Sequence, residues 1–141
     1  MKTVLFLCSG NTCRSPMASC LFNHICQERG LPFRGISAGL SALDGSPASE
    51  GAYAAMKAQG LSLLGHRAQS LTRNVIEEAD MIMAVSQGHA DVCRERFSDL
   101  LLPIRVFSPA IPDPYQASTA VYLQTAAAMQ PQILALAEAL S

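Results

Sequence analysis

A cysteine and an arginine stand near the start of the chain, in the segment Cys-Ser-Gly-Asn-Thr-Cys-Arg-Ser at residues 8–15. A short loop with Gly10 in it can curl so that its backbone N–H groups surround the oxygens of a phosphoryl group. Arg14 adds a bidentate fork for two of those oxygens. The same positive surroundings favour a thiolate at Cys8, placed for in-line attack on phosphorus. The spacing predicts a phosphate-binding loop with a nucleophile, whereas Cys8 alone would be interpreted as a core thiol.

The segments around this loop are those that could position it. Residues 2–7 are an apolar run typical of a strand buried on both faces. Ser15-Pro16 is typical of a helix N-cap followed by proline at the first helical position, and Gly30 is a typical helix end. A helix N-terminus beside the loop favours an anion there, through its free N–H groups and its dipole.

Apolar runs and amphipathic segments alternate along the rest of the chain. We predict strands at 33–38, 81–85 and 104–107, and helices at 47–59, 72–78, 86–97 and 117–140, the last kinked or interrupted by Pro131. Such alternation predicts one α/β domain over residues 1–141: a doubly wound sandwich with a four-stranded parallel sheet and helices on both faces. Ligands of these sheets bind at the carboxyl ends of the strands, where the loops at 8–15 and 108–116 would meet.

Composition narrows the classes of function. The formal net charge is −1 and only 15% of residues are charged, with Lys and Arg scattered, which argues against nucleic acid or an anionic membrane as partner. Five cysteines, an odd count, without a signal peptide favour reduced thiols and a cytoplasmic protein. No apolar run is long enough to cross a membrane. Cysteine spacing gives no metal site, and the chain lacks Walker and Rossmann fingerprints, so no cofactor is expected.

Residues 4–18 closely resemble the signature of the low-molecular-weight protein-tyrosine phosphatases. Three further segments resemble that family in the same order along the chain: Ser-Ala-Gly at 37–39, the stretch from His66 to Thr72, and Asp-Pro-Tyr at 113–115. The resemblance thus extends over nearly the whole chain. It implies a phosphatase that acts on phosphorylated proteins without a metal ion, as a monomer or weak dimer.

The resemblance also implies a role for each matching residue. Cys8 would form a phosphocysteine intermediate and Arg14 would bind the phosphoryl oxygens. Asp113 would protonate the leaving group and then act as base for water. Ser15 would donate a hydrogen bond to the thiolate of Cys8. The phosphate-binding residues would be Ser9, Gly10, Asn11, Thr12, Cys13 and Arg14.

Supporting roles follow from the same resemblance. Asn11 would adopt a left-handed conformation, held by hydrogen bonds that involve Ser15, Ser37 and His66. Cys13 would form a reversible disulfide with Cys8, unless it is a passive small residue. The remaining residues with reactive side chains match no such role and are interpreted as structural: Cys20, Cys26, Cys93, His24 and His89.

The substrate is left open between two phosphorylated side chains. Phosphotyrosine is the default of the family, with Leu43 and Tyr115 as walls of the pocket. Thr12, where tyrosine-specific members commonly have isoleucine, resembles the bacterial branch that acts on phosphoarginine, because its hydroxyl can accept from a guanidinium. Two other classes share such a loop: thioredoxin-coupled arsenate reductases, which need a cysteine pair after the third strand where this chain has Cys93 alone, and non-catalytic anion-binding modules.

Overall fold

The computed structural model describes residues 2–141, which form four strands and five helices. In chain order they are β1 (Lys2–Cys8), α1 (Arg14–Arg29), β2 (Phe33–Gly39), α2 (Glu50–Lys57), α3 (Arg73–Glu77), β3 (Met81–Ala84), α4 (Gln87–Arg96), β4 (Ile104–Val106) and α5 (Thr119–Leu140). The strands form one parallel sheet in the order β2-β1-β3-β4. The predicted four-stranded parallel sheet is therefore confirmed.

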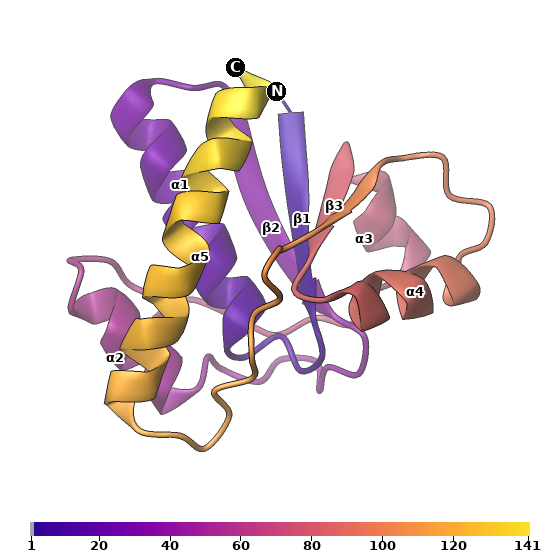
Figure 1. Cartoon of the computed structure of the whole chain (residues 1–141). Helices are drawn as coiled ribbons and strands as arrows, with labels where there is room; N and C mark the ends of the chain where they lie inside the picture. The colour runs from indigo at the N-terminus through magenta and orange to yellow at the C-terminus, as the bar shows by residue number, and fades with distance from the viewer. Residues whose placement is uncertain (1) are drawn as a thin grey trace.

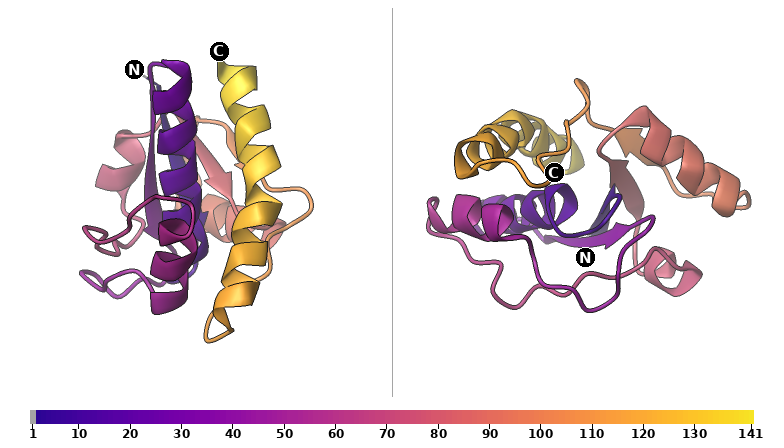
Figure 2. Two further views of the ribbon diagram at one scale, coloured as in Figure 1. Left: turned by 90° about the vertical axis from the view of Figure 1, so that its left-hand side faces the viewer. Right: turned by 90° about the horizontal axis from the view of Figure 1, so that it is seen from below.

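Helices cover both faces of the sheet, as predicted. Helices α1, α2 and α5 lie on one face, and α3 and α4 lie on the other (Figure 1). Helices α1 and α5 run side by side along the sheet (Figure 2). From β1 the chain first passes to β2, which lies on one side of β1. The later strands β3 and β4 lie on the other side, so the strand order reverses at β1. A crevice at the carboxyl end of β1 is the expected ligand position in such a sheet.

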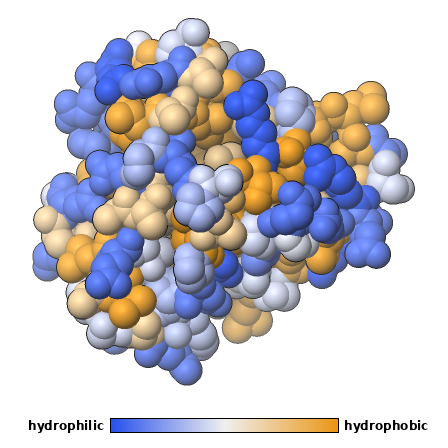
Figure 3. Space-filling view, viewed as in Figure 1, coloured by the Kyte–Doolittle hydropathy of each residue, from blue (hydrophilic) through white to orange (hydrophobic). Residues whose placement is uncertain are grey.

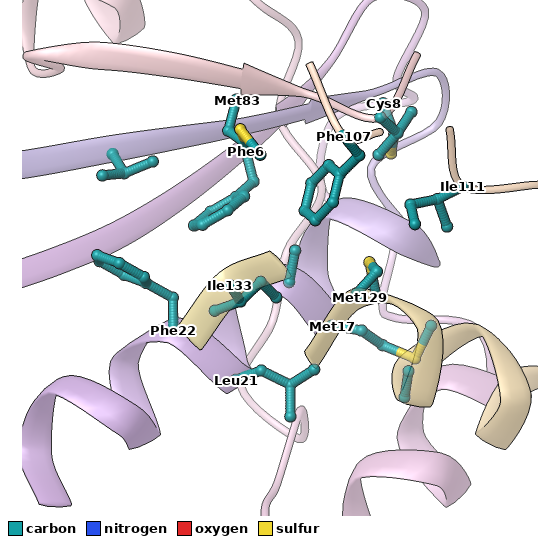
Figure 4. Packing of buried hydrophobic residues seen from close by; sticks show 14 of the residues in the cluster. Phe6, Cys8, Met17, Leu21, Phe22, Met83, Phe107, Ile111, Met129 and Ile133 are labelled. Carbon is teal, nitrogen blue, oxygen red and sulfur yellow. The ribbon is translucent and has the colours of Figure 1, made fainter. Parts of the chain in front are cut away.

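Alternate side chains of β1 enter two separate cores. Val4 and Phe6 pack in the larger core beneath α1, α2 and α5, whereas Leu5 and Leu7 pack in the smaller core beneath α3 and α4. Figure 4 shows Phe6 in the larger core with, among others, Phe22, Phe107, Met129 and Ile133. Burial on both faces explains why residues 4–7 form a continuous apolar run. It also holds the end of β1, and with it Cys8, rigidly in place.

Some predicted element boundaries were wrong by a few residues. Helix α1 begins at Arg14 after Cys13, so Ser15 is not its N-cap and lies within the first turn with Pro16. Helix α2 occupies Glu50–Lys57 within the predicted 47–59, with Ser49 as its cap, and α5 begins at Thr119 after Ser118 rather than at 117. Helix α5 continues through Pro131 without interruption.

The surface mixes hydrophobic and hydrophilic residues on the face seen in Figure 3. Leu43 and Tyr115 are among the large apolar side chains that remain exposed, at 79% and 61%. Among the described residues, no helix combines the length and the apolar character needed to cross a membrane.

Candidate active site

The loop after β1 and the segment that leads to α5 meet at one end of the sheet, the lower end in Figure 1. A cavity of about 400 Å³ lies there, at the carboxyl end of β1. Sequence segments more than a hundred residues apart contribute to its lining: Cys8, Ser9, Gly10, Thr12, Cys13, Arg14, Ser41, Leu43, Ser46, Asp113 and Tyr115. The structure thus brings together the predicted nucleophile, the predicted arginine and the predicted acid in one pocket.

The carbonyl groups of the loop are bound by donors outside it. Those of Cys8, Ser9 and Thr12 accept from the backbone N–H groups of Leu40, Ser41 and Ser49, each at 2.9 Å. The carbonyl of Asn11 lies 2.7 Å from His66 Nε2. In contrast, the backbone N–H groups of residues 10–13 have no acceptor among residues 2–141. The loop therefore directs its acceptors away from the pocket and keeps donors for an anion.

Cys8 lies at the base of this loop, at the last position of β1. Its Sγ is 2.8 Å from the hydroxyl of Ser15, in the first turn of α1. Ser15 accepts a hydrogen bond from Asn11 Nδ2 at 2.8 Å, and its own hydrogen has two acceptors in reach, the sulfur at 2.8 Å and the carbonyl of Ala38 at the longer distance of 3.5 Å. All three side chains are buried. A hydroxyl aimed at the sulfur stabilises a thiolate there.

Asn11 has the left-handed backbone conformation expected of it, with φ of 56°. Its side-chain oxygen accepts from the backbone N–H of Gln69 at 2.9 Å, and its carbonyl contacts His66. Burial is the main cause that lowers the pKa of His66, and nearby Arg67 lowers it further, whereas the bond to Asn11 opposes them. A neutral ring is therefore favoured at His66.

Ser37 contributes to this support in another way than expected. Its carbonyl accepts from Gln69 Nε2 at 2.9 Å, whereas the partners that the structure gives Asn11 are Ser15, His66 and Gln69. Gln69 thus bridges Asn11 and β2 through its backbone and side chain. Gln69 could not be predicted, because a glutamine in a loop carries no signal of a partner that lies 58 residues away.

Arg14 crosses the pocket from the start of α1. Its guanidinium is buried, donates to the carbonyl of Ile111 at 2.9 Å and lies 3.8 Å from the carboxylate of Asp113. Asp113 is half-exposed at 51%, and its other oxygen accepts from the backbone N–H of Tyr115 at 3.0 Å. The arginine is held from the segment after β4, so its fork keeps one orientation at the pocket.

Three side chains surround the mouth of the pocket. Leu43 and Tyr115 extend from the loops after β2 and β4, and both are exposed. Thr12 lines the pocket from the loop itself, with its hydroxyl 3.7 Å from the sulfur of Cys13. The mouth therefore offers an apolar wall, an aromatic wall and one hydroxyl.

Cys13 faces a polar cluster behind the loop. Its thiol donates to the hydroxyl of Ser49 at 3.3 Å and is 3.3 Å from the phenol oxygen of Tyr122 on α5. All five cysteines are free thiols. Of the cysteines interpreted as structural, Cys26 and Cys93 are buried in the two cores and Cys20 is partly buried against the larger core.

His89 lies beside the pocket, although its sequence position gave it no role there. Its Nε2 is 2.8 Å from the hydroxyl of Ser9, and its Nδ1 is 2.6 Å from the hydroxyl of Ser86. Burial is the largest cause that lowers the pKa of His89, and the charge of Arg14 adds to it, while Asp113 opposes both. Only the parallel pairing of β1 with β3 brings α4 to the loop, so no local pattern could have revealed this contact.

A buried thiol under free amides, with an arginine and an acid beside it, suits phosphoryl transfer by way of sulfur. Fold and pocket together define the class of cysteine-dependent phosphatases, which pass a phosphoryl group to a thiolate and then to water. The family model described as low molecular weight phosphotyrosine protein phosphatase matches residues 3–141. The chain belongs to that family, and the phosphocysteine mechanism is general to it.

The relatives that are similar to this chain include proteins named as arginine phosphatases and proteins named as tyrosine phosphatases. A protein-arginine-phosphatase of Bacillus subtilis is 31% identical over 129 residues, which cover 86% of this chain and 85% of that protein. The probable low molecular weight protein-tyrosine-phosphatase AmsI of Erwinia amylovora is 34% identical and covers 84% of this chain and 83% of its own. A solved low molecular weight protein tyrosine phosphatase from T. tengcongensis superposes with a TM-score of 0.93 at 32% identity, covering 98% of this chain and 99% of that one.

Proposed function

We propose that residues 1–141 form a single phosphatase domain that hydrolyses phosphotyrosine in proteins, with Cys8 as nucleophile, Arg14 as phosphate clamp and Asp113 as acid and base. One observation carries this proposal. Cys8 Sγ lies 2.8 Å from a hydroxyl that can stabilise it, in the same pocket as the loop amides, Arg14 and Asp113. Each group needed for two-step phosphoryl transfer is thus present within one cavity.

In the first step, the Cys8 thiolate attacks phosphorus and forms a sulfur–phosphorus bond as the bond to the tyrosine oxygen breaks. Arg14 and the loop amides bind the equatorial oxygens, which carry the charge of the transition state. Asp113 gives its proton to the departing phenolate. The backbone amides of the loop and the buried guanidinium of Arg14 supply the charge stabilisation that a metal ion provides in other phosphoryl-transfer enzymes.

In the second step, water attacks the phosphocysteine. Asp113, now a carboxylate, takes a proton from that water, and the sulfur–phosphorus bond breaks to release inorganic phosphate. The hydroxyl of Ser15 donates to the departing thiolate. Cys8 is then again a thiolate and Asp113 again carries a proton, so both groups have returned to their starting states.

The mouth of the pocket supports phosphotyrosine as substrate. Tyr115 and Leu43 can pack on the two faces of a phenyl ring, because both extend exposed apolar surface beside the pocket. Thr12 favours phosphoarginine as a second candidate, since its hydroxyl lines the pocket where a guanidinium could donate. The similarity to a protein-arginine-phosphatase of Bacillus subtilis supports the same candidate.

Matched peptides that carry phosphotyrosine or phosphoarginine at the same position test the substrate. We expect a higher kcat/KM for phosphotyrosine, and Cys8→Ser gives the blank. The Thr12→Ile variant is the specificity control, because it removes the hydroxyl and should lower kcat/KM for phosphoarginine more than for phosphotyrosine. A clear preference of the wild type for phosphoarginine, lost in Thr12→Ile, would replace the first candidate by the second.

We further infer a redox-sensitive enzyme of the cytoplasm, a compartment that suits five free cysteines. Cys13 is adjacent to Arg14 in the loop and would capture an oxidised Cys8 as a disulfide, which a thiol reductant reverses. Peroxide should then inactivate the wild type reversibly and Cys13→Ser irreversibly, with Cys20→Ser as control. Equal recovery of Cys13→Ser would exclude the disulfide.

A further inference from the structure

Three polar side chains form a chain from helix α4 to the phosphate loop. Ser86 is the N-cap of α4, and its hydroxyl accepts from the backbone N–H of His89 at 3.3 Å. The same hydroxyl lies 2.6 Å from Nδ1 of His89, and Nε2 of that ring lies 2.8 Å from the hydroxyl of Ser9. Ser9 follows Cys8 directly and lines the pocket. The ring therefore connects a helix cap to the loop that would hold the phosphoryl group.

The two neutral tautomers of His89 have opposite effects at Ser9. With the proton on Nδ1, Nε2 accepts the hydrogen of Ser9, whose oxygen then presents only lone pairs to the pocket. With the proton on Nε2, the ring donates to Ser9, and the hydroxyl of Ser86 donates to Nδ1. The hydrogen of Ser9 is then free to point into the pocket.

An anion in the pocket selects the second arrangement. Lone pairs that face a phosphoryl oxygen repel it, whereas an O–H donor forms a charge-assisted hydrogen bond, about twice as strong as a neutral one. In that arrangement all three hydrogens of the chain have acceptors: Ser86 to Nδ1, Nε2 to Ser9, and Ser9 to the phosphoryl group. Burial and the neighbouring Arg14 lower the pKa of His89, which agrees with a ring that carries one proton.

We propose that Ser9 donates its hydroxyl hydrogen to the bound phosphoryl group and that His89, through Ser86, is the positioning residue that aims it. Ser9 touches the substrate, whereas His89 acts only through Ser9. The proposal rests on the proposed function for the assignment of residues 8–14 as the phosphate loop. It adds a side-chain donor to the backbone amides and Arg14, and it gives α4 a part in catalysis.

A double-mutant cycle on Ser9→Ala and His89→Ala tests the proposal. The primary readout is the dissociation constant of inorganic phosphate by calorimetry, because it needs no turnover; kcat and KM for p-nitrophenyl phosphate are the second readout. We expect each single variant to weaken phosphate binding about tenfold, as for a hydrogen bond to a charged group. We expect the double variant to bind no more weakly than Ser9→Ala alone, since His89 has no route to the phosphate without Ser9.

Two further variants separate positioning from a general effect on folding. His89→Gln keeps an N–H donor toward Ser9 and should restore most of the affinity for phosphate. His24→Ala removes a histidine of α1 that contacts Glu28 rather than the loop, and should bind phosphate like the wild type. Thermal unfolding of each variant identifies any loss of fold.

The outcomes are distinct. Independent, multiplicative losses in the double variant, or unchanged phosphate affinity in His89→Ala, would overturn the proposal. A wild type whose turnover does not depend on Cys8 would instead overturn the proposed function, while the phosphate constants would still report on His89.

Discussion

Asp113 is the residue whose proposed role is proton transfer rather than binding of the phosphoryl group. It lines the pocket, is half-exposed, and lies 3.8 Å from Arg14. We predict that Asp113→Asn lowers kcat/KM on a phosphotyrosine peptide by about a hundredfold to a thousandfold, within the usual contribution of a general acid. Because p-nitrophenolate leaves without a proton, the loss of kcat/KM on p-nitrophenyl phosphate should be much smaller.

Steady-state kinetics on both substrates check this prediction. kcat/KM reports the formation of the phosphocysteine, whereas kcat also includes its hydrolysis, which Asp113 assists for both substrates. An equal loss of kcat/KM on the two substrates would show that Asp113 does not protonate the leaving group.

Residues whose chemistry is rare and whose spacing is local could be predicted from the sequence. Cys8 and Arg14 are in one loop, so their pattern could be recognised without a fold. Ser15 was placed at the sulfur by resemblance but also misinterpreted as a helix cap, because a serine before a proline has the same local pattern in both roles. His89 contacts Ser9 across 80 positions, which no local pattern records.

At the scale of elements, the end of β2 limits how the phosphate loop can lie. A Cβ at Gly39 would collide with the carbonyl oxygen of Ser9 and lie 3.0 Å from the backbone N of Asn11. Both neighbours are backbone atoms, which cannot turn away as a flexible side chain does. The close approach of β2 to the loop therefore requires glycine at this position.

We predict that Gly39→Ala displaces the loop, lowers the free energy of unfolding by about 1–3 kcal/mol as overpacking does, and reduces kcat/KM at least tenfold. Gly65→Ala is the matched control, because a Cβ there meets nothing within 4 Å and its φ is not positive. Urea unfolding and steady-state kinetics measure the two effects. Gly39→Ala with the activity and stability of Gly65→Ala would contradict this account of the contact.

The strands and helices could be predicted from the periodicity of apolar residues, whereas the residues at which they begin and end could not. Apolar runs at 2–7 and 81–85 predicted strands because burial on both faces leaves no polar position in a parallel strand. The start of α1 at Arg14 was missed because Cys13, its N-cap, makes no capping hydrogen bond with its side chain. No capping residue therefore marks this position in the sequence. The order β2-β1-β3-β4 places β1 between β2 and β3, and this topology decides which distant loops meet.

For the whole molecule, two histidines with lowered pKa values make stability depend on pH. Burial lowers the pKa of His66 and of His89 from the ordinary value of 6.5. The unfolded chain therefore binds more protons than the folded one as pH falls through that value, so the free energy of unfolding decreases with acidification. We predict that stability is full above about pH 7 and declines toward pH 5.

Urea unfolding at pH 7.5 and pH 5 measures this dependence. His66→Gln and His89→Gln should each reduce the difference in free energy of unfolding between the two pH values, whereas His24→Gln, at a partly exposed position of α1, should not. An unchanged difference in both variants would show that other groups cause the acid sensitivity.

The central claim is that Cys8 carries the phosphoryl group between substrate and water. The most direct measurement mixes Asp113→Ala with excess p-nitrophenyl phosphate, quenches within the first turnovers by denaturation, and maps the phosphoryl group by peptide mass spectrometry. Asp113→Ala slows hydrolysis of the intermediate, whereas formation of the intermediate from this substrate needs no acid. The account therefore predicts one phosphoryl group on the peptide that contains Cys8, and none after prior alkylation of the thiol. Turnover of the substrate with no phosphoryl group on Cys8, or full activity in Cys8→Ser, would contradict it.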